Sequence, residues 1–476
     1  MALFRRITLL GFVICCLAGK NGFAQKDKDK DRPVAVWLTD PGHNVFFQQQ
    51  PDQRLEKDGA STGPVIRLDD GKGLQEMEGF GFALTDGSAQ HLLRMSPDAR
   101  TALLRELFGT DSSHIGISYL RISIGASDLS DHVYSYDDLP SGQTDTAMTH
   151  FDLGPTLRDV VPVLNEIIRI NPQIKIMGSP WSAPVWMKTN HDTRGGSLLK
   201  QYYSAYANYL AKFILSMQDQ GIFIESITVQ NEPLHPGNNP SMFMPAEEER
   251  DFIKSALGPV FQRARIDTRI IIYDHNADRP DYPITVLKDP EARQYIDGTA
   301  FHLYAGKIDS VSLVHDAFPD KNLYFTEQWV GAPGDLKKDI PEHIHKLIIG
   351  ASRNWCKTVI EWNLTSNPAL QPHTDRGGCD RCLGGVTIDG DKVTRNPGYY
   401  IIAHAAKFVR PGSTRMVSSS DDSLPNVAFR TPDRQNVVIV LNNTETPQTF
   451  TIDYKGKKMR PALEPGAVAT YIMDLK

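Results

Sequence analysis

Eight short apolar segments, each ending in a polar or aromatic cluster, recur along the middle of this 476-residue chain. They begin 24 to 58 residues apart, which leaves room for a helix between successive segments. Two of the connections, 155–170 and 198–218, carry clear helical patterns of apolar residues. Eight alternating strand–helix units predict an α/β protein with a (β/α)8 barrel. The expected strands are 79–86, 117–126, 175–184, 226–233, 269–276, 298–306, 322–331 and 358–364.

Strand-like segments flank the predicted barrel at both ends. Residues 34–48 and 64–68 precede it, and the segments 436–441, 448–454 and 467–473 follow it, separated by turn residues. We therefore expect a TIM barrel with an appended β-sandwich that is built from both termini. The predicted division is a signal peptide (1–24), a charged tether (25–33), N-terminal sandwich strands (34–70), the catalytic barrel (71–405) and the C-terminal sandwich (406–476).

The first 24 residues have the layout of a secretory signal peptide. Two arginines at positions 5 and 6 precede a mostly apolar stretch, and small residues occupy the −3 and −1 positions of a cleavage point after Ala24. The apolar stretch, about a dozen residues long, is too short for a permanent anchor. An uncleaved anchor and a lipoprotein signal are the alternatives. We expect a secreted, periplasmic or cell-surface protein without an integral membrane segment after cleavage.

Composition narrows the class of function. Hydrophobic residues make up 40% and charged residues 23%, which are ordinary values for a soluble globular protein. A net charge of −6, without a long basic segment after the N-terminus, argues against a nucleic-acid partner. Cys379 and Cys382 form a CxxC pair, which in an exported protein favours a disulfide; zinc is the alternative, but no second ligand pair accompanies it. Cys356 is expected to be a buried thiol, and the sequence predicts no metal and no cofactor.

The ends of the fourth and seventh expected strands carry glutamates. These ends read QNEP (230–233) and FTEQ (325–328). Because the active site of such a barrel lies at the C-terminal ends of its strands, Glu232 and Glu327 are expected to face each other. Two opposed carboxylates about 5–5.5 Å apart can hydrolyse a glycoside with retention, and the Asn231 amide can hold the sugar 2-OH. The alternative to a catalytic role is that one or both glutamates form ion pairs that only stabilise the structure.

Seven motifs then occur in one order along the chain. They are EGFGFALTD (78–86), YLRISIG (119–125), SPWSAP (179–184), TVQNEP (228–233), HLY (302–304), TE (326–327) and EWNL (361–364). In these motifs the chain resembles glycoside hydrolase family 30, the family of lysosomal glucosylceramidase and bacterial β-1,6-glucanases. The resemblance spans roughly residues 64–476 and implies a (β/α)8 barrel beside a β-sandwich built from both termini.

The resemblance also implies a role for each matching residue. Glu232 corresponds to the acid/base and Glu327 to the nucleophile; Asp86, Trp181, Asn231 and Trp362 correspond to residues that hold the sugar in the −1 subsite; Arg121, His302 and Tyr304 correspond to residues near the nucleophile. The alternatives are rim packing for the two tryptophans, another acidic partner for Arg121 and a structural role for His302. We expect Arg121 and Tyr304 to lower the pKa of Glu327, and the charge on Glu327 to raise the pKa of Glu232.

Taken together, the patterns predict a retaining β-glycosidase that hydrolyses β-glucosidic linkages. The loop 377–388 resembles the β-1,6-glucanase and bacterial glucosylceramidase-like branches of the family. We expect β-1,6-glucan as the substrate, with a glucosylceramidase-like β-glucosidase as the alternative. A non-catalytic carbohydrate-binding protein is the alternative from another class, and the loss of either carboxylate would be its mark. A metal-dependent esterase or lyase is not supported, because the sequence contains no compact His/Asp cluster that could hold its metal.

Overall fold

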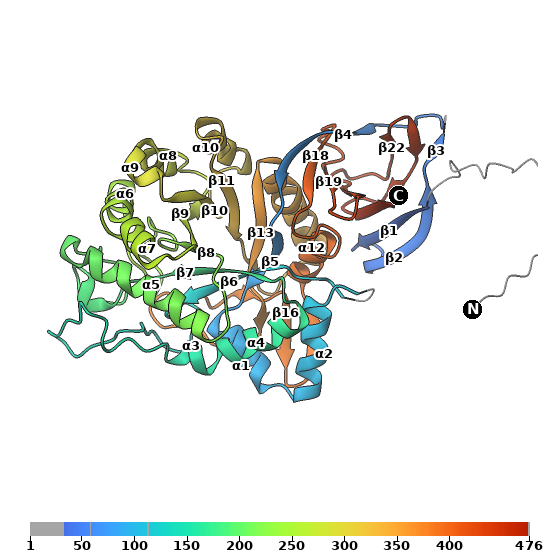
Figure 1. Cartoon of the computed structure of the whole chain (residues 1–476). Coiled ribbons are helices and arrows are strands. Elements are labelled where there is room, and N and C mark those ends of the chain that lie inside the picture. The colour runs from blue at the N-terminus through green and yellow to red at the C-terminus, as the bar shows by residue number, and fades with distance from the viewer. Residues whose placement is uncertain (1–32, 58, 112–113, 475–476) are drawn as a thin grey trace, which may run out of the picture.

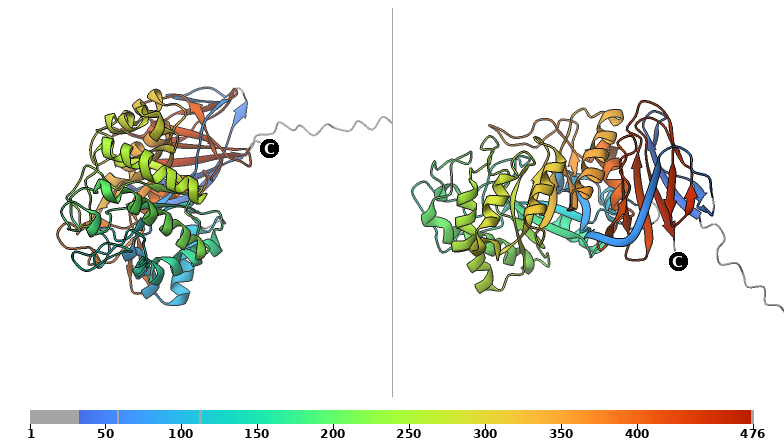
Figure 2. Two further views of the ribbon diagram at one scale, coloured as in Figure 1. Left: turned by 60° about the vertical axis from the view of Figure 1, so that its left-hand side comes forward. Right: turned by 90° about the horizontal axis from the view of Figure 1, so that it is seen from above.

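The computed structural model describes residues 33–57, 59–111 and 114–474. A barrel surrounded by helices lies beside a β-sandwich, as Figure 1 and the two further views in Figure 2 show. The predicted signal peptide, and the predicted tether apart from Pro33, lie outside the described residues, so both stay predictions. Within the described ranges, no helix has the length and apolar character needed to cross a bilayer.

Eight parallel strands close into the barrel, and the last strand pairs with the first. The strands are β5 (Gly79–Ala83), β6 (Tyr119–Ile124), β7 (Lys175–Pro180), β8 (Ser226–Thr228), β9 (Arg269–Asn276), β10 (Ile296–His302), β11 (Asn322–Glu327) and β13 (Cys356–Asn363). Every expected strand segment overlaps one of them, so the predicted (β/α)8 barrel is confirmed; β10 and β13 each begin two residues before their expected segments. A cluster of buried side chains that includes Tyr119, Ile271 and Tyr324 packs inside the barrel, separately from the core around it.

Helices follow the barrel strands and cover the outside of the barrel (Figure 1). They are α1 (Asp86–Arg94), α2 (Pro97–Phe108), α3 (Pro155–Arg158), α4 (Val160–Ile170), α5 (Tyr203–Asp219), α6 (Ala246–Phe252), α7 (Gly258–Ala264), α8 (Asp281–Lys288), α9 (Pro290–Arg293), α10 (Ser312–Ala317), α11 (Leu336–His343) and α12 (Pro397–Ala406). Wider π-helical turns, Ile253–Leu257 and Ile344–Ala351, continue α6 and α11.

The helix expected over 155–170 is two helices. α3 ends at Arg158 and α4 begins at Val160. Pro162 explains the break, because its ring clashes with the carbonyl of residue 158 and it has no N–H to donate there, whereas the first turn of a new helix tolerates it. α4 then buries the apolar stripe that the pattern predicted, including Leu164 and Ile167, while Leu157 on α3 stays 42% exposed.

Strands from both ends of the chain build the sandwich. They form a ten-stranded sheet in the order β2-β1-β25-β20-β19-β18-β4-β22-β23-β3. The strands are β1 (Pro33–Asp40), β2 (Val45–Arg54), β3 (Glu56–Lys57), β4 (Val65–Glu76), β18 (Thr414–Ser418), β19 (Asn426–Arg430), β20 (Gln435–Leu441), β22 (Thr451–Tyr454), β23 (Lys457–Met459) and β25 (Val468–Asp474). Blue and red strands therefore lie side by side at one end of the molecule in Figure 1. The sandwich from both termini is confirmed; β4 runs across residue 70, and the domain boundaries stay predictions.

The sandwich packs directly against the barrel. On β19, Val427 and Phe429 belong to the core cluster shared with the barrel, whereas Ala428 between them belongs to the core of the sandwich. The rings of Phe80 in β5 and Phe429 lie 6.5 Å apart, edge to face. The alternating directions of side chains on a strand thus place one apolar face in each core.

Short strands complete the loops at the C-terminal end of the barrel. They are β12 (Val330–Gly331), β14 (Thr365–Ser366), β15 (Cys382–Leu383), β16 (Val386–Asp389) and β17 (Lys392–Arg395), while β21 (Gln448–Thr449) pairs with β24 (Ala462–Leu463) beside the sandwich. Gly81 in β5 shows why one motif glycine is needed: a Cβ there would lie 1.8 Å from the carbonyl oxygen of Tyr119 on the neighbouring strand. This glycine permits the close packing of the two strands.

Candidate active site

A cleft of about 310 Å³ opens at the C-terminal end of the barrel. Its lining residues are Asp128, Glu232, His235, Asn238, His275, Asn276, Tyr304, Glu327, Trp329, Trp362, Cys379 and Cys382. Four residues predicted from the sequence line it: Glu232, Glu327, Tyr304 and Trp362. Arg121 and His302 contact these groups from beneath, and Asn231 and Trp181 contact Arg121, so the fold brings eight of the nine predicted residues into one network.

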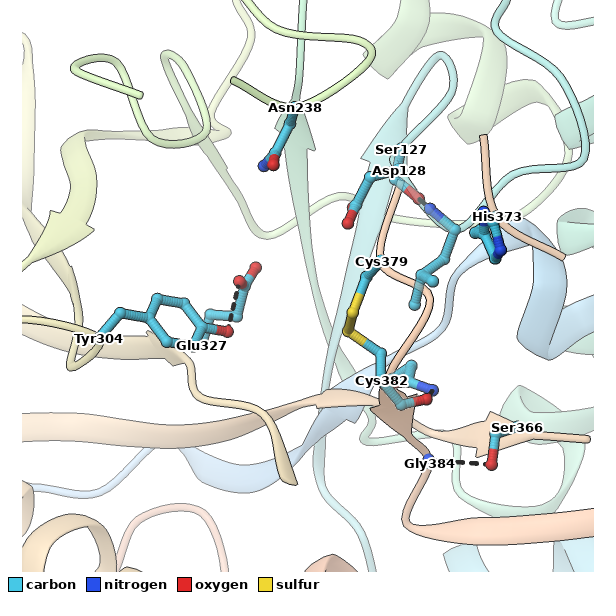
Figure 3. The surroundings of a disulfide bond; sticks show 12 residues. Ser127, Asp128, Asn238, Tyr304, Glu327, Ser366, His373, Cys379, Cys382 and Gly384 are labelled. Atoms are coloured by element: carbon cyan, nitrogen blue, oxygen red, sulfur yellow. Dashed lines mark hydrogen bonds between the residues drawn. A yellow bond between two sulfur atoms is a disulfide. The ribbon is translucent and has the colours of Figure 1, made fainter. Parts of the chain in front are cut away.

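Glu327 is the last residue of β11, and two donors hold its carboxylate. Arg121, fully buried on β6, donates from Nη1 to Oε2 at 2.6 Å. Tyr304, just after β10, donates its hydroxyl to Oε1 at 2.9 Å, as the dashed line in Figure 3 marks. Both oxygens of the predicted nucleophile are therefore fixed in direction before any substrate binds.

Glu232 lies four residues beyond the end of β8, on a strained backbone. Its φ is 44°, in the left-handed region that residues other than glycine rarely adopt. Its N–H donates to the carbonyl of Asp274 at 3.0 Å, which holds the turn. Strained residues of this kind cluster where the surrounding structure must aim a side chain. Here the strain aims the Glu232 carboxylate into the cleft.

His302, the last residue of β10, lies between the two glutamates. Its Nδ1 is 3.2 Å from Oε1 of Glu232 and 3.9 Å from Oε1 of Glu327. Because both distances are measured from the same nitrogen atom, the two Oε1 atoms cannot be more than 7.1 Å apart. The two carboxylates of strands 4 and 7 thus face each other, as the sequence predicted.

Asp274 on β9 organises the network from beneath, and our reading of the sequence missed it. Five side chains donate to its carboxylate: Arg121, Ser179 and Thr228 to Oδ2, and His302 and Thr326 to Oδ1. Burial raises the pKa of Asp274, but the Arg121 charge and the His302 hydrogen bond outweigh burial and hold it well below its usual range. The available signal was its position at the end of the fifth expected strand.

Electrostatics link the two glutamates to His302. Burial raises the pKa of Glu327 above its ordinary value, and the charges of His302 and Arg121 offset only part of this effect. Burial also acts on Glu232, but the hydrogen bond and charge of His302 outweigh it and lower the pKa. Although burial lowers the pKa of His302, Glu327 and its bonds to Asp274 and Glu232 raise it to about 9. The directions expected for Glu327 and Glu232 were wrong, because that argument left out burial and His302.

Glu232 and His302 share one proton, which lies between Nδ1 of His302 and Oε1 of Glu232. Nε2 of His302 donates to the ionised Asp274 at 3.1 Å, so Nδ1 is the atom that faces Glu232. An imidazolium beside a carboxylate and an imidazole beside a carboxylic acid differ only in where the proton lies along this contact. With a His302 pKa of about 9, the pair holds its proton at neutral pH and can deliver it through Glu232.

Two tryptophans and an asparagine surround this network. The rings of Trp181 and Trp362 lie 5.4 Å apart, and the Arg121 guanidinium lies 4.8 Å from the Trp181 ring centroid. Trp362 lines the cleft, whereas Trp181 packs behind it. Asn231 accepts a hydrogen bond from Arg121 at 2.7 Å through Oδ1, which fixes the direction of its amide.

Asp86 does not line the cleft. Its Oδ2 accepts from the hydroxyls of Ser130 and Tyr134 at 2.6 and 2.9 Å, while Oδ1 is buried without a partner among the described residues. The aspartate that lines the cleft is Asp128, from the loop after β6. Sequence reasoning missed Asp128, and no periodicity or motif spacing signals it. The sugar-binding role of Asp86 stays a prediction.

Asp128 lies beside the disulfide that Cys379 and Cys382 form (Figure 3). It is 7% exposed, and its carboxyl accepts no hydrogen bond from another residue in the described ranges. The N–H of Thr374 donates to its backbone carbonyl at 3.0 Å, which ties this loop to the cysteine loop. Burial and the charges of Glu327 and Glu232 raise the pKa of Asp128 to about 8, so the carboxyl is neutral near pH 7. Cys356 is a buried free thiol, as expected.

Comparison with known proteins agrees with this geometry. Residues 77–409 match the glycosyl hydrolase family 30 TIM-barrel domain, and residues 412–471 match the glycosyl hydrolase family 30 beta sandwich domain. The chain belongs to glycoside hydrolase family 30. It is therefore a glycoside hydrolase, and the resemblance stated from the motifs is confirmed.

Endo-1,6-beta-glucanases and glucosylceramidases are among the proteins similar to this chain. The endo-1,6-beta-D-glucanase of Neurospora crassa is 35% identical over 387 residues, 78% of this chain and 79% of the relative. The solved structure of the endo-beta1,6-glucanase BT3312 has a TM-score of 0.86 and 33% identity, covering 93% of this chain and all of that one. The lysosomal acid glucosylceramidase of Mus musculus is 29% identical over 450 residues, 88% of this chain and 85% of the relative.

Proposed function

We propose that this chain is a retaining glycosidase that cleaves β-1,6-glucan, with Glu327 as the nucleophile and Glu232 as the acid/base. One observation carries the mechanism: a single imidazole nitrogen lies 3.2 and 3.9 Å from the carboxylate oxygens of the two glutamates in an open cleft. This geometry is compatible with the short carboxylate separation that a direct attack on the anomeric carbon requires.

In the first step, a carboxylate oxygen of Glu327 attacks the anomeric carbon while the bond to the leaving oxygen breaks. Glu232 gives its proton to that oxygen, so the departing sugar leaves with a free hydroxyl. Arg121 and Tyr304 keep the attacking carboxylate aligned. His302 supplies the proton store behind Glu232, because the pair holds one proton between them.

In the second step, the Glu232–His302 pair accepts a proton from water. The resulting hydroxide attacks the anomeric carbon and breaks the ester bond to Glu327, which returns to its ionised form. Two inversions retain the β-configuration. The Asn231 amide is positioned to meet the sugar 2-OH, and Trp362 offers an apolar face to the C–H side of the ring. Of the other residues expected in the −1 subsite, Trp181 supports Trp362 from behind, and Asp86 does not line the cleft.

The linkage rests on the relatives. Proteins named as endo-1,6-β-glucanases are 33–35% identical to this chain, and the glucosylceramidases among the relatives stand at 29% or below. The polar cleft, lined by acids, imidazoles and two indoles, suits a polyhydroxylated chain of sugars. The N-terminal signal pattern supports export to the place where such a polymer is met.

The test is hydrolysis of β-1,6-glucan (pustulan), glucosylceramide and an aryl β-glucoside by the purified mature chain. We expect the β-1,6-glucan to have the highest kcat/KM and its first products to carry the β-configuration by proton NMR. If glucosylceramide is cleaved preferentially, the proposed substrate is wrong, but the proposed retaining mechanism still stands. First products of α-configuration would overturn the retaining mechanism itself.

A further inference from the structure

A long loop connects β6 to α3 across residues 125–154, and none of its residues lies in a helix or strand. Loops of this length without secondary structure are uncommon in compact domains and need their own stabilising contacts. Aromatic residues supply part of them; Tyr136, for example, stacks on Tyr209 with ring centroids 5.7 Å apart. The loop also carries Asp128 to the wall of the cleft. What holds its middle section is therefore relevant to the site.

Asp137 is the anomaly in this loop. It is 1% exposed, and neither oxygen of its carboxylate has a hydrogen-bond partner among the described residues. Its backbone is held on both sides, since its N–H donates to the Ser135 hydroxyl and its carbonyl accepts from Nε1 of Trp186 at 3.1 Å. A buried carboxylate without a partner costs several kcal/mol, so a compensating group is expected at this position.

Two further ligand-type side chains meet Asp137. Asp145 is 6% exposed, and its Oδ2 lies 3.0 Å from Nδ1 of His150. One ligand atom each from Asp137, Asp145 and His150 lies within 4.8 Å of the other two. Among the residues that the structure describes, no lysine or arginine forms an ion pair with either aspartate. Oδ2 of Asp145 also accepts from the Thr149 hydroxyl and the His150 N–H, so the carboxylate of Asp137 is the one in this cluster that is left without a partner.

We propose that Asp137, Asp145 and His150 bind a zinc ion that pins the 125–154 loop. Carboxylate oxygens and an imidazole nitrogen form a donor set typical of zinc, whereas calcium and magnesium prefer oxygen ligands alone. The His150 side chain is 67% exposed, which gives the ion an entry path and leaves room for water as the fourth ligand. Binding also gives both oxygens of Asp137 a positive neighbour. The spacing of these residues follows no zinc signature in the sequence.

The experiment measures zinc binding by the full chain after removal of metals with a chelator. Glu232, His275 and His302 form a second group of possible ligands in the cleft, so the titrations use a Glu232→Gln background. Isothermal titration with zinc chloride should give one equivalent. Saturation should raise the Tm by about 3 °C, because the ligand binds only the folded state.

Two variants test the ligands, and one tests the specificity of the effect. Asp137→Asn and His150→Ala should each weaken zinc binding at least about tenfold and remove the Tm shift. The matched control is His132→Ala, which removes an exposed histidine of the same loop that is paired with Asp131. The control should leave both readings unchanged.

The proposal fails if the Glu232→Gln chain shows no saturable zinc binding, or if Asp137→Asn binds zinc as well as its parent does. Should Asp137→Asn fold poorly, His150→Ala decides, because its exposed side chain can be removed at little cost to the fold. Unchanged zinc affinity in His150→Ala would overturn the proposal. None of these outcomes bears on the glycosidase assignment, which is tested by product analysis.

Discussion

The two ends of the barrel each hold a buried cluster of arginine and carboxylate, and the balance of charge differs between them. At the N-terminal end of the strands, the buried carboxylate of Glu78 meets three cations, and two of them also pair with the more exposed Glu225. At the C-terminal end, Arg121 and His302 serve three carboxylates: Glu232, Asp274 and Glu327. The N-terminal end therefore has more cations than carboxylates, whereas the C-terminal end has fewer cations than carboxylates.

The N-terminal cluster is a closed structure. Arg269 binds both oxygens of Glu78 at 2.7 Å, and Lys357 and Lys175 lie 2.9 and 3.6 Å away. Burial raises the pKa of Glu78, but the bond and charge of Arg269 outweigh burial and lower it to about 2. These ion pairs therefore serve the stability of the barrel.

The C-terminal cluster stays open. Glu232 and Glu327 line the cleft, and Nε of Arg121 and Nδ1 of His275 are buried without hydrogen-bond partners among the described residues. Tyr273, Asp274 and Glu232 all have positive φ values. Unpaired charge and backbone strain reduce stability, and they persist where a substrate completes the site. The comparison predicts that substitutions at the two ends separate activity from stability.

Glu327→Gln should give the largest effect on activity. The change keeps the shape of the side chain but removes the nucleophile, so kcat should fall by about 10⁴-fold or more. The Tm should hardly change, because the amide keeps contacts with Tyr304 and Arg121. Steady-state kinetics on an aryl β-glucoside and a thermal melt measure the two quantities.

The residue that an activated fluoro-glucoside labels in the parent chain provides an independent check. Mass spectrometry of the digested protein should find the sugar on Glu327. Labelling of Glu232 would mean that Glu232 is the nucleophile and Glu327 the acid/base. Labelling of neither glutamate would contradict the covalent mechanism.

Glu78→Gln should show the reverse pattern. Removing the charge leaves Arg269 and two lysines without their carboxylate, and breaking a buried pair in this way costs about 3 kcal/mol. The kcat should stay within about twofold of the parent. Equilibrium unfolding in urea at pH 7 measures the loss, and a variant that melts like its parent would show that this cluster does not stabilise the barrel.

The acid dependence sharpens the test of Glu78. A lowered folded-state pKa of about 2 means that the Glu78 stabilisation is fully present above its unfolded value of about 4.3. It is lost as the pH falls towards 2, where both states bind the proton. The difference in unfolding free energy between parent and Glu78→Gln should therefore shrink between pH 5 and about pH 2. A constant difference would exclude the titration of Glu78 as its source.

His302→Gln should affect the pH profile more than the fold. Activity needs one proton on the Glu232–His302 pair, so the parent should lose kcat/KM as the pH rises through about 9. Without the imidazole, this basic limb should move down by at least about one pH unit, and kcat should fall about 10- to 100-fold. His235→Gln, in the same cleft, is the control and should keep the limb in place. An unmoved limb in His302→Gln would assign His302 a purely structural role.

Much of the fold and half of the chemistry could be predicted from the sequence. Apolar runs that end in polar residues mark barrel strands, and the C-terminal ends of these strands meet by geometry. Glu232 and Glu327 follow from this rule without knowledge of the loops. Asp274 obeys the same rule, but in the run 269–276 nothing distinguishes a structural hub from a residue that touches substrate.

The remainder depended on tertiary contacts that leave no periodic pattern. Asp128 reaches the cleft because the irregular 125–154 loop folds back onto Thr374, and Asp86 is covered by that same loop. The pKa order of the two glutamates depends on His302, whose place between them is set by the register of β10 and β11. Side chains in irregular loops, and charges shared by three groups, cannot be placed from spacing alone.

The smallest expected effect concerns Asp128, at the open end of the comparison. Because its pKa is about 8, the carboxyl is neutral at pH 7 and can both donate and accept a hydrogen bond to a sugar hydroxyl. Asp128→Asn keeps a donor and an acceptor, so its KM for β-1,6-glucan should stay within about threefold of the parent. Asp128→Ala removes both and should raise KM about tenfold with kcat changed less. Above pH 8 the parent carboxyl ionises and loses its donor, so the parent KM should rise there while that of Asp128→Asn stays flat. Equal KM values for Asp128→Ala and Asp128→Asn at pH 7 would show that Asp128 contacts no substrate. Of the three acids that line the cleft, only Glu232 and Glu327 would then act on the substrate.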